Sequence, residues 1–251
     1  MPFTPVAFRR FAAAALSLAA LPFYTAPAAA GVDEGDRPAI ERIVREYLIA
    51  NPEVLVEAMQ ALEQRQQTAA DQKARAALKQ NRQQIFNDDA SPVGGNPKGD
   101  VTVVEFFDYN CGYCKAVHDD ALKLVKDDGR LRYVYKEFPI LGPGSVVAAK
   151  AALAARAQGK YVEAHNALMS HRGRLDEAAV LRILGDAGLD VTKLKADMEA
   201  PAVAKAIESN LLLADKLGIR GTPAFIIGDE LAPGAIKLDE MKRMVAEARK
   251  K

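Results

Sequence analysis

The only two cysteines of the chain lie two residues apart, in the motif CGYC at residues 111–114. The apolar run VTVVEFF, residues 101–107, precedes them, and an amphipathic pattern follows them. This order predicts a buried strand, a CxxC motif at a helix start and a helix over residues 111–127. The alternating stretch at residues 130–138 predicts a second strand, so together these parts indicate a βαβ unit.

A CxxC pair can be a structural staple, part of a metal site or a redox centre. A disulfide between residues three apart closes a very small loop and stabilises a fold by only about 2 kcal/mol, which disfavours a staple. Cys111, Cys114 and His118 have a spacing that suits a soft metal, but the chain lacks the second CxxC motif of a four-ligand zinc site. We therefore expect no resident metal and no cofactor. Transient capture of copper or zinc by the reduced dithiol is the alternative.

The position of Cys111 at a helix start favours the redox role. Unpaired N–H groups and the helix dipole stabilise a thiolate there, and the thiolate is the form that attacks a disulfide sulfur. Cys114 lies one turn further into the helix, so we expect Cys111 to be the nucleophile and Cys114 the resolving cysteine. Of the three histidines, we expect His118 to be a partly exposed helix residue, and His165 and His171 to carry no catalytic role.

Residues 1–30 have the pattern of an export signal. Arg9 and Arg10 form a short basic start, residues 11–21 form an apolar run, and small residues follow at the expected cleavage position. The apolar run is too short to span a membrane, and an uncleaved anchor is the alternative. Export would place the cysteines in an oxidising compartment, so we expect a periplasmic protein. The nearly balanced charge, 34 basic against 33 acidic residues, gives no indication of nucleic-acid binding.

Residues 38–86 have the periodicity of helices. Asn51 and Pro52 interrupt the pattern, and we expect Asn51 to cap a second, longer helix with Pro52 at its first position. An amphipathic helix needs an apolar partner, so we expect the apolar face of this segment to pack against other copies of the chain. A solvated spacer is the alternative. The face consists of Ile40, Ile43, Val44, Leu48, Leu55, Met59 and Leu62.

The rest of the chain divides at turn signals. Residues 87–100 predict a turn-rich linker and a domain boundary. Residues 144–217 are helical in pattern, with breaks at Gly159, near Gly173, at Gly188 and at Pro201. Residues 222–236 predict a strand, a Gly-Asp turn and a return strand, and the C-terminal residues predict an amphipathic helix.

Three stretches carry a family resemblance: VVEFFDYNCGYCKAVH, YKEFPILGPGS and GIRGTPAFIIG. Together they resemble the DsbA-like thiol–disulfide oxidoreductases of the thioredoxin superfamily, over residues 91–250. The resemblance implies an α/β thioredoxin fold with an inserted helical domain at about 144–217, preceded here by an N-terminal helical extension. The expected organisation is a signal peptide (1–30), an extension and linker (31–90) and the DsbA-like domain (91–251).

The resemblance also implies roles for residues around the motif. Gly112 and Tyr113 form the dipeptide that tunes the redox poise. Pro223 is implied to be the cis-proline that faces the disulfide, and Thr222 to offer backbone groups to an extended substrate chain. A cis peptide bond is physically suited to this position because such bonds are essentially confined to proline.

Glu105 matches the buried acid that assists proton transfer in this superfamily. A carboxylate in an apolar run usually has a functional reason, which supports that role. The alternative is a carboxylate at a strand edge that faces water. Asp108 and Glu137 are weaker candidates for the same role.

A helical extension before such a domain resembles the ScsC-type proteins linked to suppression of copper sensitivity, in which the extension can build oligomers. CGYC also occurs in the dimeric periplasmic disulfide isomerases. These resemblances imply an enzyme that exchanges disulfides with protein substrates, depends on a membrane redox partner and acts as an isomerase or reductase when oligomeric. The alternatives are a monomeric dithiol oxidase and a copper-binding or chaperone-like protein that uses CGYC to sequester metal.

Overall fold

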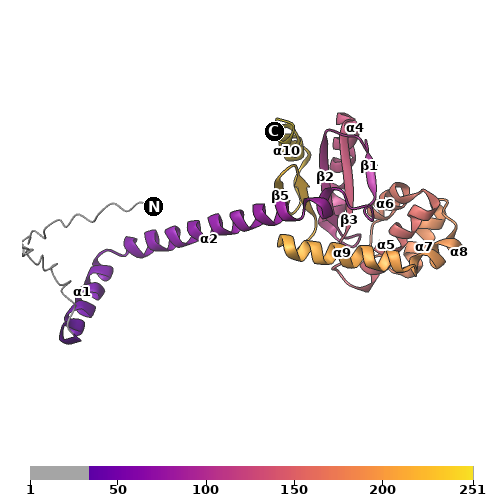
Figure 1. Cartoon of the computed structure of the whole chain (residues 1–251). Coiled ribbons are helices and arrows are strands. Elements are labelled where there is room, and N and C mark those ends of the chain that lie inside the picture. The colour runs from indigo at the N-terminus through magenta and orange to yellow at the C-terminus, as the bar shows by residue number, and fades with distance from the viewer. Residues whose placement is uncertain (1–33, 251) are drawn as a thin grey trace, which may run out of the picture. The chain divides into compact units, whose positions relative to one another are not determined.

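The computed structural model describes residues 34–250 (Figure 1). The expected signal peptide, residues 1–30, lies outside the described residues. The chain forms two compact units, one up to Gln60 and one from Ala61 onward, here called the N-terminal unit and the main unit. No helix in the described part is long and apolar enough to cross a membrane.

The N-terminal unit consists of helices. A short 3-10 helix, η1 (Glu34–Asp36), leads into α1 (Arg37–Ala50), and α2 (Glu53–Gln80) begins after a break at Asn51 and Pro52. The predicted break is confirmed, but the predicted cap is wrong. The backbone N–H and the side-chain amide of Asn51 both donate to the carbonyl of Tyr47, at 2.8 and 2.9 Å. Asn51 therefore ends α1 instead of capping α2.

Apolar side chains of the N-terminal helices are exposed to solvent within the single chain. Their exposed fractions range from 40% at Ile40 to 69% at Ile49, and Leu48 is half-buried. The exposed set, here called the apolar row, consists of Ile40, Ile43, Val44, Tyr47, Ile49, Leu55, Val56, Met59 and Leu62.

The main unit is built on a five-stranded sheet in the order β1-β3-β2-β4-β5. Strands β2 and β3 run parallel, and every other neighbouring pair is antiparallel. Helix α4 (Gly112–Asp128) connects β2 to β3, which confirms the predicted βαβ unit. The strands are β1 (Val93–Gly95), β2 (Val101–Phe107), β3 (Leu131–Glu137), β4 (Ala224–Ile227) and β5 (Glu230–Pro233).

Helices cover both faces of the sheet, as parallel strands require. Successive residues of a strand point to opposite faces. One face packs against α4 and α10 (Leu238–Ala248), in a cluster that includes Val103, Phe107, Tyr133, Tyr135, Cys114, Val117 and Met241. The other face packs in a second cluster that includes Val104, Phe106, Val134, Leu78, Ile85, Phe86 and Leu213. Strand alternation therefore places Glu105 on the α4 face, between Val103 and Phe107.

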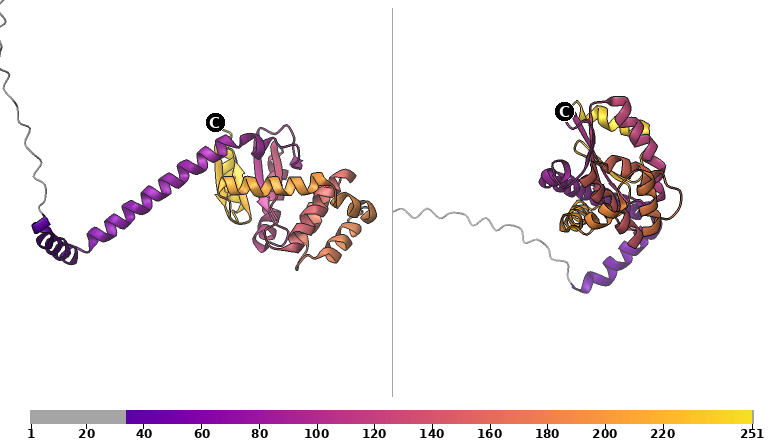
Figure 2. Two further views of the ribbon diagram at one scale, coloured as in Figure 1. Left: turned by 60° about the horizontal axis from the view of Figure 1, so that its bottom comes forward. Right: turned by 90° about the vertical axis from the view of Figure 1, so that its right-hand side faces the viewer.

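The helical insertion follows β3, as the sequence predicts; most of it gathers at one end of the sheet, and its last helix runs back along the sheet (Figures 1 and 2). Gly159 and Gly188, at two of the predicted breaks, have positive φ values of 68° and 80°, which non-glycine residues rarely adopt. The insertion consists of α5 (Pro143–Ala154), η2 (Ala155–Gln158), α6 (Tyr161–Ser170), α7 (Glu177–Asp186), α8 (Val191–Met198) and α9 (Pro201–Leu217).

The segment around the predicted linker is more ordered than its turn-rich sequence indicates. Strand β1 lies within residues 87–100 and pairs with β3, with Val93 opposite Val134. Before it, Leu78 at the end of α2 and Ile85 and Phe86 of α3 (Arg82–Phe86) are buried in the second cluster. The packed core of the main unit therefore begins before the linker.

Candidate active site

The turn between β2 and α4 is organised by Asp108. One of its carboxylate oxygens accepts from the N–H of Asn110 at 2.7 Å, and the other accepts from the N–H groups of Ile140 and Leu141 at 2.9 Å each. Its carbonyl accepts from the N–H of Cys111 at 3.0 Å. These bonds join the turn before the motif to the loop after β3. Asp108, one of the weaker proton-transfer candidates, thus holds the backbone that presents Cys111.

Cys111 lies at the N-cap of α4 and is 6% exposed. Its Sγ accepts from the N–H of Cys114 at 3.5 Å and lies 3.3 Å from the carbonyl oxygen of Thr222, to which only the protonated form of Cys111 can donate. Hydrogen bonding from the Cys114 thiol, and to a lesser degree from Thr222 and from backbone N–H groups, lowers the pKa of Cys111 from 9.0 to about 5, although burial opposes this shift. Cys111 is therefore largely thiolate at neutral pH.

Cys114 has the opposite character. It is fully buried, and burial first, then its hydrogen bond to Cys111 and the charge of Glu105, raises the pKa of its thiol. Neither Cys111 nor Cys114 forms a disulfide in the structure. The site thus holds one thiolate and one protonated, shielded thiol. Tyr113 between them is 71% exposed, so the outer surface of the motif is aromatic.

Thr222 and Pro223 come to the motif from the other end of the chain. The bond between them is cis, as the resemblance implies. Strand β4 begins directly after Pro223 and pairs with β2, which brings this loop to the end of β2 where α4 begins. The carbonyl of Pro223 accepts from the N–H of Gly234 at 2.8 Å, which ties the loop to the end of β5.

Glu105 is buried on the face of the sheet that α4 covers. Its side chain is 4% exposed, so the alternative of a carboxylate that faces water is wrong. Tyr133 of β3 donates to Glu105 Oε2 at 2.7 Å. Burial raises the pKa of Glu105 from 4.5 to about 7, although the Tyr133 bond opposes the shift and the Cys111 charge adds to it. A carboxyl group with this pKa can both accept and return a proton near neutral pH.

We expect Glu105→Gln to remove a pH-dependent loss of stability. Because the folded-state pKa of Glu105 is raised, its contribution is fully present below pH 4.5 and is lost as the pH rises through about 7. The free energy of unfolding of the wild-type protein should fall by about 3 kcal/mol over this pH range. Glutamine keeps an oxygen that accepts from Tyr133 but cannot ionise, so the variant should not show this fall. Urea unfolding of both reduced proteins, at low and high pH, measures the difference. Stability curves that run parallel across this pH range would contradict the assignment.

Glu137, the other weaker candidate, belongs to a separate hydrogen-bond network. Tyr109 and Tyr161 both donate to its Oε1, at 2.9 and 2.7 Å, and burial raises its pKa. Tyr109 Oη also lies 3.1 Å from His165 Nδ1. Glu137 Oε2 has no hydrogen-bond partner among the described residues. Within the described part of the chain, no hydrogen bond joins Glu137 to either cysteine.

The expectation that His118 is partly exposed is wrong. It is 5% exposed because α4 turns it inward toward His165 of α6, with 5.3 Å between the ring centroids. Burial lowers its pKa, and its Nε2 has no partner within the described part of the chain. The described residues contain no group of three or more His, Cys, Asp or Glu side chains arranged to hold a metal ion.

Sequence reasoning missed two residues that flank the motif. Asn110 and Lys115 both bond to the loop between α6 and α7, far along the chain. From the sequence pattern, Asn110 is expected to be a turn residue and Lys115 an ordinary helix residue. Their long-range partners leave no local signal.

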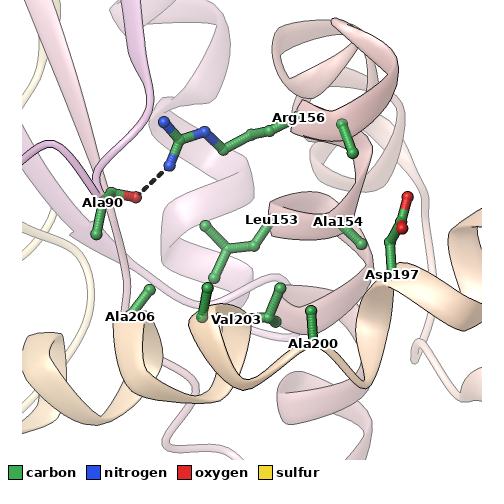
Figure 3. Close-up of a pocket in the computed structure, with 10 residues that line it drawn as sticks. Ala90, Leu153, Ala154, Arg156, Asp197, Ala200, Val203 and Ala206 are labelled. Carbon is green, nitrogen blue, oxygen red and sulfur yellow. Dashed lines mark hydrogen bonds between the residues drawn. The ribbon is translucent and has the colours of Figure 1, made fainter.

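A separate cavity of about 280 Å³ lies in the helical insertion (Figure 3). Alanines and Leu153 form most of its wall, and Arg156 crosses it to donate to the carbonyl of Ala90 at 2.5 Å. None of the predicted site residues lines this cavity. The cavity is therefore separate from the motif.

Solved structures with the same fold come from several bacteria. A thioredoxin-like oxidoreductase from Silicibacter pomeroyi DSS-3 is 51% identical, with a TM-score of 0.67, over 68% of this chain and 99% of that one. Proteus mirabilis ScsC in a transitional conformation is 31% identical, with a TM-score of 0.65, over 88% and 98% of the two chains. BcfH of Salmonella enterica Typhimurium is 30% identical, with a TM-score of 0.73, over 86% and 96%.

Several curated relatives share only a segment with this chain. The NhaA 1 sodium/proton antiporter of Salinispora arenicola is 30% identical over 162 residues, and the chain spans only 25% of its length. Two family models match more directly. The DSBA-like thioredoxin domain matches residues 102–246, and the copper resistance protein ScsC N-terminal domain matches residues 36–69. The first match covers more than half of the chain, and the chain belongs to the DSBA-like thioredoxin domain family.

Proposed function

We propose that this protein is a periplasmic protein-disulfide isomerase and reductase that works as an oligomer. The apolar row on α1 and α2 is the observation that carries the proposal. Burying each large apolar side chain contributes about 1.5–3 kcal/mol, so packing against other copies is strongly favoured. The match to the ScsC N-terminal domain covers residues 36–69 and supports the same role. An oligomer would hold several motifs around one substrate.

The chemistry begins with the Cys111 thiolate. It attacks one sulfur of a substrate disulfide, a Cys111–substrate S–S bond forms, and the substrate's own S–S bond breaks. The released substrate sulfur leaves as a thiolate and takes a proton. The backbone of Thr222 lies beside Cys111 and would bind the extended chain around the attacked disulfide. Gly112 and Tyr113 would tune the redox poise from within the motif.

The mixed disulfide can then be resolved in two ways. In reduction, Cys114 gives its proton to Glu105 and attacks the Cys111 sulfur, so the second substrate thiolate leaves and Cys111–Cys114 becomes a disulfide. In this reduction, two electrons pass from the protein to the substrate. In isomerisation, another substrate thiolate attacks the mixed disulfide, and the bonds rearrange without net electron transfer. Reduction leaves the chain oxidised, so a membrane redox partner would supply two electrons to restore the dithiol.

A monomeric dithiol oxidase is the second candidate, and the low pKa of Cys111 favours it. A thiolate that is stabilised in the reduced form makes the disulfide form a stronger oxidant. The apolar row supports the isomerase as the first candidate, because a monomeric oxidase would leave these side chains exposed. Reactivation of scrambled-disulfide ribonuclease by the reduced protein would support the isomerase. Failure to reactivate it, with rapid oxidation of a reduced peptide by the disulfide form, would support the oxidase.

We expect Leu55→Asp with Met59→Asp to lower the isomerase rate by about tenfold or more, because carboxylates in an apolar interface prevent association. Helical spacing places these two residues on one side of α2. Light scattering should show a smaller assembly, and alkylation of Cys111 should be unchanged. The matched control is Gln60→Asp with Gln64→Asp, which adds the same charges on the other side of the helix. Full isomerase activity in a monomeric variant would contradict the proposal.

A further inference from the structure

The loop at residues 171–175, between α6 and α7, is fixed to the residue that precedes Cys111. Asn110 Oδ1 accepts from the N–H of Leu175 at 2.8 Å, and Asn110 Nδ2 donates to the carbonyl of Leu175 at 3.4 Å. Gly144 permits this approach, because a Cβ atom there would lie 2.1 Å from the Leu175 oxygen. The helical insertion thus packs directly beside the start of the motif.

The same loop is fixed to the residue that follows Cys114. Lys115 Nζ donates to the carbonyl oxygens of His171 at 2.8 Å and of Gly173 at 3.2 Å. The loop is therefore held on both sides of the motif by side chains that flank it. A loop with these anchors presents its own side chains at a defined position beside Cys111.

The side chains that this loop presents are cationic. Arg172 and Arg174 are exposed, and neither forms a hydrogen bond or ion pair with any residue between 34 and 250. Burial, and then the charge of Arg172, lowers the pKa of Lys115, while the charge of Asp108 and then that of Cys111 oppose the shift. Arg172, Lys115 and Cys111 therefore lie within electrostatic range of one another.

Two carboxylates close to the motif and the loop have partners within the described part of the chain. The carboxylate of Asp108 is buried and accepts three backbone N–H groups. Asp176 caps α7 and accepts from the N–H of Ala179 at 2.8 Å. On the opposite side of the motif, Arg220 precedes the Thr222 loop and pairs with Asp215 at 2.6 Å. The unpaired charges of the loop are thus the two arginines.

We propose that the loop at residues 171–175 selects the substrates of the motif, through Arg172 and Arg174, in favour of protein disulfides flanked by Asp or Glu. The inference rests on the proposed exchange at Cys111 and names its substrate class. Guanidinium groups bind carboxylates with paired hydrogen bonds, and a cationic surface speeds the encounter with an anionic partner. The carboxylates would bind beside the sulfur that Cys111 attacks.

The test compares two synthetic peptides with the same disulfide, one with Glu and the other with Gln beside each cysteine. The reduced protein should reduce the Glu peptide about fivefold faster at low salt, and the ratio should fall toward one at high salt, because ions screen exposed charges. Arg172→Ala with Arg174→Ala should bring the ratio close to one at low salt while the rate for the Gln peptide stays the same.

The matched control is Lys195→Ala with Lys205→Ala, which removes two exposed, unpaired cations from α8 and α9 of the same insertion. This control should keep the wild-type ratio. A ratio unchanged in the arginine variant, or lost equally in the lysine variant, would overturn the inference while leaving exchange intact. Failure of the wild-type protein to reduce either peptide would instead overturn the proposed function.

Discussion

Cys111→Ser is expected to lower the rate of disulfide exchange by about three orders of magnitude or more, because a serine hydroxyl neither ionises near neutral pH nor forms a disulfide. The measurement is reduction of a fluorescent disulfide peptide by the reduced protein. Cys114→Ser should instead retain attack by Cys111 and accumulate the mixed disulfide, since the resolving thiol is gone. Exchange at the wild-type rate in the Cys111 variant would refute the assignment of the nucleophile.

The pH dependence of Cys111 alkylation provides a control for the same assignment. In the wild-type protein the rate should follow the thiolate, with a midpoint near pH 5. Hydrogen bonding from Cys114 is the largest cause of the low pKa, so Cys114→Ala should move this midpoint upward. A midpoint that stays in place would contradict this cause and leave Thr222 and the backbone N–H groups as the source of the shift.

Removal of residues 1–86 is expected to unfold the main unit, although the part that follows contains the whole motif. The deletion removes Leu78, Ile85 and Phe86, which are buried in the cluster that residues of β2, β3 and α9 also form. Loss of each such side chain costs about 2–5 kcal/mol, and a typical domain is stable by only about 5–15 kcal/mol. The deletion also removes the carbonyl of Gln84, which accepts from the fully buried Lys136 at 2.7 Å. Circular dichroism and urea unfolding measure the outcome.

Removal of residues 1–72 is the matched control and should leave a folded, redox-active unit, because it retains every buried residue named above. A pair of point variants separates packing from chain length. Phe86→Ala should destabilise the fold by about 3–4 kcal/mol, and Leu62→Ala by less than about 0.5 kcal/mol, since Leu62 is 55% exposed. A stable, active protein after removal of residues 1–86 would show that the second cluster is dispensable.

Local patterns in the sequence predict most of the fold. Strand β2 begins and ends at the predicted residues, and β3 differs from its prediction by one residue at each end. Glycines with positive φ end or separate helices of the insertion where the sequence predicts breaks. These features depend on residues that are neighbours in the chain, so periodicity and turn chemistry are sufficient to find them. The family resemblance supplies the cis bond before Pro223, which no local pattern specifies.

The candidate site divides in the same way. The CGYC spacing and its place at a helix start predict a reactive Cys111 and a shielded Cys114, and the structure adds the opposite shifts of their pKa values. Burial of Glu105 agrees with its place in an apolar run. The inward turn of His118 was not predicted, because its burial depends on α6, which packs against α4 only in the folded chain.

The sequence alone therefore determined the CxxC pair at a helix start, the βαβ unit around it and the helical character of the insertion and the extension, because each depends on the order of nearby residues. Only the tertiary structure decided which distant groups surround that pair. It brings Thr222 to the Cys111 thiol, buries Leu78, Ile85 and Phe86 against the sheet, and anchors the arginine loop to Asn110 and Lys115. These contacts join residues far apart in the chain, and burial and backbone hydrogen bonding fix them only when the whole core forms.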